Sequence, residues 1–190
     1  MTRILRDITE LRSLEEIYIE GWELIWSPLP ESIGNLENLR TLSIKNCGLN
    51  HAIPESIGEL KNLRKFELCS SWEKSYMMPI FSMNTLSTLP NTIGNLKNLE
   101  YLNVANCSFN SLPKTIGNLE NLQYFDLRGL WVSSLPESIR NLRKLKRLDL
   151  RGTICLKQFP DFIWEMPALE EVLVDNRMLK SIQNGRRINK

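Results

Sequence analysis

The sequence predicts an α/β solenoid, a horseshoe with a parallel β-sheet on its concave face and short helical or 3-10 segments on its convex face. The first observation is a phrase, LPKTIGNLENL at residues 112–122, that returns along the chain with mainly its charged letters changed. The second is the pattern apolar-x-x-apolar-x-apolar, as in LEYLNV at residues 99–104, which follows each phrase. Because one such unit cannot bury its apolar face alone, the units are expected to stack and share a core.

Each phrase predicts a short helical segment on the convex side. Its proline suits the first position of a helical turn, and apolar residues three apart, such as Ile116 and Leu119, point into the same core. The glycine after the isoleucine is expected to serve close packing, because its counterparts Thr9, Arg140 and Trp164 would be strained at positive φ. The other copies are LPESIGNLENL at 29–39, IPESIGELKNL at 53–63, LPNTIGNLKNL at 89–99, LPESIRNLRKL at 135–145 and the divergent FPDFIWEMPAL at 159–169.

The second half of each unit predicts a strand. In chain order these patterns are LEEIYI, LRTLSI, LRKFEL, LEYLNV, LQYFDL, LKRLDL and LEEVLV, the last ending at Val174, which indicates about seven repeats in a single domain over residues 1–190. Successive prolines of the phrases lie 23 or 24 residues apart, except for Pro54 and Pro90. That repeat carries an insertion of about 13 residues within 70–88.

The insertion is rich in aromatic and methionine side chains, including Trp72, Tyr76 and Phe81, and has no strand or helix period of its own. Two alternatives stay open for it. It forms a projecting loop that adds to a binding surface, or it folds back over its own repeat.

The repeat pattern resembles that of leucine-rich repeat proteins, whose units read L-x-x-L-x-L-x-x-N/C-x-L with a period of about 20 to 29 residues. The phrase LPxxIGNLxNLxxLxL is similar to cytosolic repeats of plant intracellular Ras-group-related proteins, disease-resistance proteins and bacterial effector-type repeat proteins. The LDLRG sequence at 148–152 also resembles effector repeats, some of which accompany a ubiquitin-ligase domain. The chain departs from the family pattern in lacking the usual asparagine at the N/C position, which is occupied by Trp22, Cys47, Ser71, Cys107, Leu130, Thr153 and Arg177.

Composition narrows the classes of partner. A net charge of +2 gives no basic footprint for nucleic acid, and no apolar run approaches the roughly 18 residues of a membrane span. Arg3, Arg6 and Asp7 interrupt the start of the chain, so a signal peptide is not indicated. We therefore expect no membrane association and a cytoplasmic location, or delivery into a host cell if the chain is part of an effector.

The cysteines indicate packing and no cofactor. Cys47 and Cys107 occupy equivalent positions in two repeats, where a small buried side chain fits. Cys69 and Cys155 lie elsewhere in their repeats, and no CxxC spacing suggests zinc or a redox pair. We expect reduced thiols, as is usual inside cells.

Catalysis has little support in the sequence. His51 is the single histidine, so a His-based triad or zinc site would depend on it alone. Asp126 and Asp149 occupy equivalent places in adjacent strands, which would bring two carboxylates close together. Arg128 and Arg151 follow them on the same face, and a salt-bridged surface lattice is therefore favoured over an active site. The chain is predicted to be a binding protein and not an enzyme.

Strand alternation predicts which side chains a partner would meet on the concave face. Arg40, Lys45, Arg64 and Lys65 are expected to form an early basic patch. The predicted columns are Glu16, Thr41, Lys65, Tyr101, Tyr124, Arg147 and Glu171, and beside it Tyr18, Ser43, Glu67, Asn103, Asp126, Asp149 and Leu173. Because tyrosine and arginine are enriched at binding hot spots, the predicted contacts of a protein partner are Tyr101, Asn103, Tyr124, Asp126, Arg128, Asp149 and Arg151.

Other interpretations of the whole chain remain. The repeats could be the substrate-recognition part of a larger effector or ubiquitin-ligase enzyme whose catalytic domain lies outside this sequence. The half-unit at the start and the polar residues at 181–190 favour an incomplete domain, since solenoid ends need polar covers. The chain could also be a monomer or a weak dimer in which end strands pair two copies.

Overall fold

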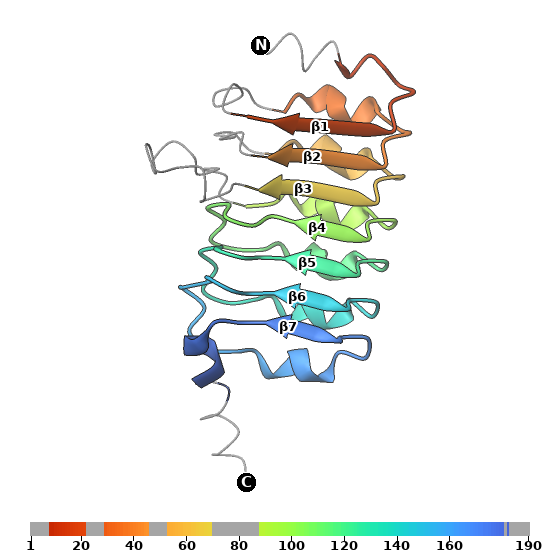
Figure 1. Ribbon diagram of the computed structural model, residues 1–190. Coiled ribbons are helices and arrows are strands. Elements are labelled where there is room, and N and C mark those ends of the chain that lie inside the picture. The colour runs from red at the N-terminus through yellow and green to blue at the C-terminus, as the bar shows by residue number, and fades with distance from the viewer. Residues whose placement is uncertain (1–7, 22–28, 46–52, 70–87, 181, 183–190) are drawn as a thin grey trace.

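The fold is a single open sheet of parallel strands that follow one another in chain order (Figure 1). A computed structural model describes residues 8–21, 29–45, 53–69, 88–180 and 182. Cys47, His51 and residues 70–87 of the insertion therefore lie outside the described residues. The seven strands are β1 (Glu16–Glu20), β2 (Thr41–Lys45), β3 (Lys65–Cys69), β4 (Tyr101–Asn103), β5 (Tyr124–Asp126), β6 (Arg147–Asp149) and β7 (Glu171–Leu173).

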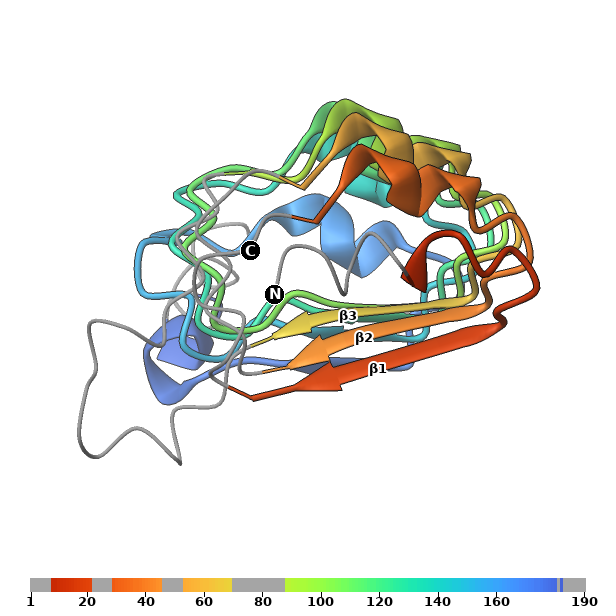
Figure 2. The same cartoon turned by 90° about the horizontal axis from the view of Figure 1, so that it is seen from above.

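The convex side carries short 3-10 turns, which lie opposite the sheet (Figure 2). One such turn precedes each of the strands β2 to β7 in the chain. Each turn begins after a proline in the extended conformation and buries one isoleucine, as in Pro113 and Ile116. The prediction of a short helical or 3-10 segment is thereby confirmed. The turns are η2 (Glu31–Asn35), η3 (Glu55–Glu59), η5 (Asn91–Asn95), η6 (Lys114–Asn118), η7 (Glu137–Asn141) and η8 (Asp161–Glu165).

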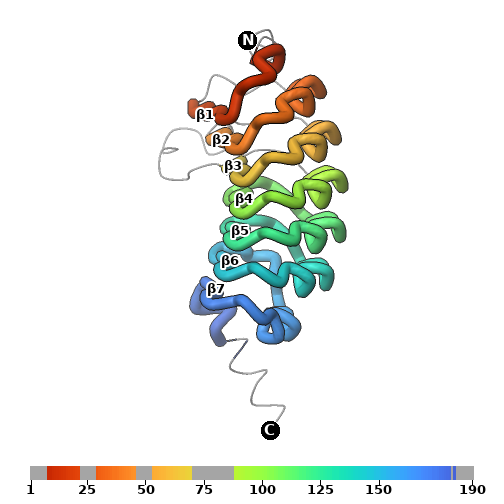
Figure 3. Tube along the Cα trace, turned by 90° about the vertical axis from the view of Figure 1, so that its right-hand side faces the viewer, coloured from red at the N-terminus to blue at the C-terminus, as the bar shows by residue number. Residues whose placement is uncertain are grey.

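The core fills the space between the sheet and the turns. The leucines of the phrases and strands are buried there, and Leu119 and Leu122 are fully buried. Seen from the side, the strands line the inner, concave face of the arc and the turns lie outside it (Figure 3). The α/β solenoid predicted from the repeat is confirmed. In the part of the chain that is described, no helix is long and apolar enough to cross a membrane.

The glycines of the phrases are needed because the turns stack closely. A Cβ atom built on Gly94 or Gly117 would collide with the carbonyl oxygen of Thr115 or Ser138 in the next turn, and neither glycine has a positive φ. This confirms the prediction of close packing. The last turn, η8, lies nearer the sheet than the other turns (Figures 2 and 3), and Arg140, at the position of these glycines in η7, pairs with Glu165 of η8 at 2.6 Å.

Asparagine side chains link the repeats just before strands β2 to β5. Each donates to a backbone carbonyl of the preceding repeat, so the repeats are tied together outside the core. The bonds run from Asn38 Nδ2 to Arg12 O at 3.0 Å, Asn62 to Glu37 at 2.8 Å, Asn98 to Lys61 at 2.9 Å and Asn121 to Lys97 at 2.8 Å.

The N/C position of the repeat is served by other side chains. Cys107 Sγ donates to Leu68 O of the preceding repeat at 2.9 Å, and Thr153 Oγ1 donates to Leu150 O at 2.7 Å. Leu130 is fully buried at the same position. Packing and other hydrogen bonds thus replace an asparagine inside these repeats.

Candidate functional site

The strand register places the two predicted columns on the sheet. Neighbouring strands pair residue for residue, so Lys65, Tyr101, Tyr124 and Arg147 follow one another across β3 to β6. In the second column Glu67, Asn103, Asp126 and Asp149 do the same. The predicted alignment of both columns is confirmed from β1 to β7.

A tyrosine pair occupies the middle of the first column. The ring centroids of Tyr101 and Tyr124 are 6.1 Å apart with the planes tilted by 38°, and Lys65 Nζ lies 5.2 Å from the Tyr101 centroid. Partial burial, with the nearby carboxylates of Glu67 and Asp126, raises the pKa of Tyr101 above its ordinary value. Tyr101 is therefore a neutral phenol at physiological pH, and Tyr124 beside it is 42% exposed.

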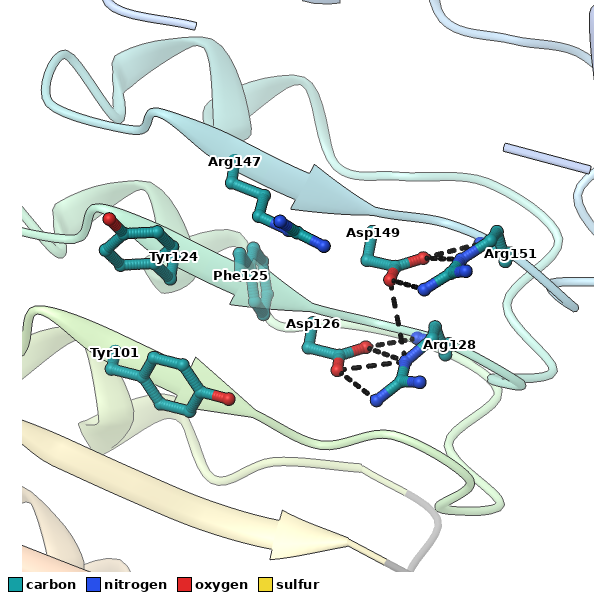
Figure 4. Close-up of a pocket in the computed structure, with 8 residues that line it drawn as sticks. All are labelled: Tyr101, Tyr124, Phe125, Asp126, Arg128, Arg147, Asp149 and Arg151. Carbon is teal, nitrogen blue, oxygen red and sulfur yellow. Dashed lines mark hydrogen bonds and ion pairs between the residues drawn. The ribbon is translucent and has the colours of Figure 1, made fainter. Parts of the chain in front are cut away.

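Two aspartate–arginine pairs form the late part of the second column. Arg128 binds Asp126 through Nε at 3.0 Å and Nη2 at 2.8 Å, and Arg151 binds Asp149 through Nε at 3.0 Å and Nη2 at 2.7 Å. Arg128 Nε also lies 3.5 Å from Asp149 Oδ2, which joins the pairs (Figure 4). The hydrogen bonds to the aspartates raise the pKa of both guanidinium groups. The salt-bridged lattice expected from the sequence is confirmed.

Two of the predicted contact residues are buried and hold the backbone. Asn103 Oδ1 accepts the N–H of Ala105 at 2.9 Å, and Asp149 Oδ1 accepts the N–H of Arg151 at 3.1 Å. Both side chains are nearly covered by their neighbours. They shape the turns that follow β4 and β6, and they present little surface to a partner.

A shallow hollow of about 330 Å³ brings together most of the predicted contact residues (Figure 4). Arg147 was left out of the predicted contacts, although it belongs to the same column as both tyrosines, which was the signal for it. It pairs with Glu171 at 2.8 Å. The hollow, called the concave hollow below, is lined by Tyr101, Tyr124, Phe125, Asp126, Arg128, Arg147, Asp149 and Arg151.

The early basic patch predicted from the sequence is compensated by acidic residues. Lys45 Nζ and Lys65 Nζ each lie 3.2 Å from the buried carboxylate of Glu67, which also accepts a hydrogen bond from Ser43 at 2.8 Å. Arg40 and Arg64 have their own carboxylate partners, Glu15 at 3.5 Å and Glu100 at 2.8 Å. This end of the sheet therefore carries balanced charge.

Among the described residues, no group of three or more His, Cys, Asp or Glu side chains is placed to hold a metal ion.

Residues 87–184 match the family model of a leucine-rich repeat region, and residues 38–60 match that of a single leucine-rich repeat. The chain belongs to the leucine-rich repeat proteins. A comparison with curated protein sequences found no match.

Solved leucine-rich repeat structures resemble the chain over most of its length. The plant peptide hormone receptor RGFR1 in complex with RGF2 is 26% identical over 88% of this chain, with a TM-score of 0.66, and the chain spans only 25% of that receptor chain. The leucine-rich repeat domain of the type III effector XopL is 28% identical over 80% of this chain and 58% of its own, with a TM-score of 0.58. The Arabidopsis receptor kinase HAESA in complex with an IDA peptide hormone is 28% identical over 78% of this chain and 24% of its own, with a TM-score of 0.60.

Proposed function

We propose that this leucine-rich repeat chain is a protein-binding module, non-catalytic by itself, that takes a protein partner on its concave face across β4 to β6. The observation that carries the proposal is the tyrosine pair, half-buried Tyr101 and exposed Tyr124, beside arginines in the concave hollow. Tyrosine and arginine dominate binding hot spots because they bury a large area and still offer polar contacts. A cytoplasmic location is part of the proposal.

The similar structures support binding as the activity. RGFR1 and HAESA are solved in complex with peptide hormones. The chain covers about a quarter of either receptor, so their ligands are not carried over to it. What supports this chain's own binding role is the set of residues in its concave hollow.

The chemistry of the described residues favours binding over catalysis. Asp126 and Asp149 are both neutralised by arginines, so neither is a free general base. Burial raises the pKa of the Cys69 thiol to about 11. Cys69 is therefore protonated at neutral pH and is a poor nucleophile.

The size of the sheet sets the extent of the contact. Strands about 4.8 Å apart give a sheet of roughly 30 Å, and a useful width of about 10 to 15 Å provides only several hundred Å². A standard interface buries about 800 Å² per partner. The partner is therefore expected to continue beyond the strands onto a rim of the solenoid.

Site-specific photo-crosslinking tests the proposed face. The photo-crosslinking residue p-benzoylphenylalanine replaces Tyr124 on the concave side or, as the matched control, the exposed Lys114 on the convex side. In lysate from the source organism, we expect a discrete crosslinked partner from position 124 and none from position 114. Crosslinking from position 114 alone would place the partner on the convex side and reject the proposal.

A second candidate function is the substrate-recognition domain of a larger effector or ubiquitin-ligase enzyme. The similarity to the leucine-rich repeat domain of the type III effector XopL favours it. Sequencing the full transcript distinguishes the two candidates. A catalytic domain in the same reading frame supports the recognition domain, and a transcript that encodes repeats alone supports the free-standing module.

A further inference from the structure

Two consecutive repeats share a longer motif than the others. Residues 126–131 read DLRGLW and residues 149–154 read DLRGTI, so each has an aspartate, an arginine, a glycine and a final large apolar residue. The preceding repeat has NVANCS at the same positions, residues 103–108. The motif is thus confined to two neighbouring repeats. It begins at the last residue of β5 and of β6 and continues into the turns that follow them, at the carboxyl ends of the strands.

The backbone at this edge is fixed by hydrogen bonds that continue beyond the strands. Asn106 N–H donates to Arg128 O at 2.7 Å, and Gly129 N–H donates to Arg151 O at 2.9 Å. Asn106, Gly129 and Gly152 all have positive φ. Glycine is favoured at position 129 by this conformation, and a Cβ atom there would also displace Asn106 Oδ1.

A second hollow, of about 500 Å³, lies over these turns and is called the edge hollow here. Trp131 is 47% exposed and Ile154 is 60% exposed, although both are large and apolar. Their turns are anchored, since Trp131 N–H donates to Phe109 O at 3.0 Å and Arg177 Nη1 donates to Ile154 O at 2.7 Å. Large apolar side chains held in the open at matching positions of adjacent repeats mark an interaction site.

Arginines separate the edge hollow from the concave hollow. Arg128 and Arg151 line both hollows. Arg128 donates hydrogen bonds from Nε and Nη2 to Asp126, and Arg151 donates from the same two atoms to Asp149. Their Nη1 groups have no partner within the described part of the chain. The Arg128 side chain is 45% exposed and that of Asp126 only 15%, so a partner meets the guanidinium groups, with the carboxylates behind them.

We propose that the edge hollow binds a segment of a protein partner in which an aromatic or branched aliphatic side chain stands beside an aspartate or glutamate. The apolar side chain packs between Trp131 and Ile154, and the carboxylate accepts hydrogen bonds from Nη1 of Arg128 or Arg151. Each arginine is already paired with an aspartate, so the cluster offers Nη1 donors without a net positive charge, which suits one carboxylate with an apolar neighbour better than a polyanion. The inference goes beyond the proposed function, because it concerns the edge of the sheet and does not use the tyrosines. The preformed turns lower the ordering cost of binding.

Selection from a phage-displayed library of random dodecapeptides tests the proposal. Peptides enriched on the parent protein are synthesised and titrated against the parent, the Trp131→Ser/Ile154→Ser variant and, as the control for the concave face, Tyr124→Ala. We expect enrichment of peptides with an apolar residue next to Asp or Glu, and a loss of affinity of about tenfold or more in the Trp131→Ser/Ile154→Ser variant. Replacing the peptide carboxylate by its amide should weaken binding by a similar factor.

The outcomes separate the two proposals. Peptides that lose affinity with Trp131→Ser/Ile154→Ser and keep it with Tyr124→Ala support the edge hollow. Peptides that depend on Tyr124 and bind the edge variant as tightly as the parent overturn the edge hollow and support the concave face. Failure to enrich any acidic, apolar class also overturns it. Circular dichroism melting establishes that the substituted proteins remain folded, and Trp131→Phe, which keeps an aromatic ring, should retain most of the affinity.

Discussion

Glu67 is the residue that turns the early basic cluster into a balanced surface. Burial raises the pKa of Glu67, but the hydrogen bonds from Ser43, Lys65 and Lys45 outweigh it, and the net pKa lies below its ordinary value. The two lysines were visible in the sequence as a positive patch. Their charge compensation was not visible, because it depends on the register that places Glu67 of β3 opposite Ser43 of β2, within reach of both lysines.

Replacing Glu67 by Gln should make stability less dependent on pH. The folded-state pKa is lowered, so the carboxylate stabilises the protein above its unfolded pKa of about 4.3 and loses that effect as the pH falls through the folded value. At pH 7 we expect Glu67→Gln to cost about 1.5 to 3 kcal/mol. Urea unfolding should show the gap from the parent closing as the pH falls below about 4.3. A gap of constant size across this range would contradict the assigned ionic contacts.

Replacing Gly117 by Ala should destabilise the fold through overpacking. The added methyl group meets the carbonyl of Ser138 in the next turn, which is backbone and cannot move aside cheaply. A cost of about 1 to 3 kcal/mol in the free energy of unfolding is expected.

Arg140→Ala at the equivalent position of the next repeat is the matched control. It removes only exposed ion pairs with Glu137 and Glu165, worth about 0 to 1 kcal/mol. If Gly117→Ala proved no more destabilising than Arg140→Ala in urea unfolding, close stacking of the turns would not be the reason for the glycine.

At the scale of the element, each strand and its 3-10 turn form a unit that completes the core of its neighbours. Leu119 directly follows the turn η6 as its C-cap and is fully buried between sheet and turns. Truncating it removes apolar contacts and leaves a cavity that the rigid, close-packed neighbours fill only in part.

Leu119→Ala should therefore cost about 2 to 5 kcal/mol in the free energy of unfolding. Glu120→Ala, at the exposed neighbouring position, should change it by less than about 0.5 kcal/mol. Urea unfolding followed by circular dichroism and by tryptophan fluorescence should give coincident transitions, because the repeats unfold as one cooperative solenoid. A Leu119→Ala protein as stable as the parent would remove Leu119 from the core.

The strands and turns could be predicted from sequence because the spacing of leucine and isoleucine fixes both the register and the buried face. The columns through Tyr101 and Tyr124 followed from strand alternation alone. The asparagine bonds before strands β2 to β5 could not be predicted in this way. Asn98 in the phrase looks like any surface residue until the preceding repeat lies beside it. The edge hollow was missed for a similar reason. Its signal, DLRGLW followed by DLRGTI, was present, but the exposure of Trp131 and Ile154 depends on the turns after the strands.

For the whole molecule, the important property is the change in surface along the arc. The early strands carry balanced charge around Glu67, the middle presents Tyr101 and Tyr124, and the late repeats present Arg128 and Arg151, which are more exposed than the aspartates they bind. Both proposed contact surfaces meet at these arginines. A partner that fills the concave hollow and continues over the edge would reach the interface size that the sheet alone does not supply.

Titration calorimetry of the crosslinked partner, once purified, is the most direct test of the concave face. The parent, the Tyr101→Ala/Tyr124→Ala variant and the convex control Lys114→Ala are titrated with the same partner. Binding to the tyrosine variant should be weaker by about 2 kcal/mol or more, since the rings are hot-spot anchors. Lys114→Ala should bind like the parent, and urea unfolding should give all three proteins nearly the same stability. Equal affinity of the parent and the tyrosine variant would contradict binding on the concave face.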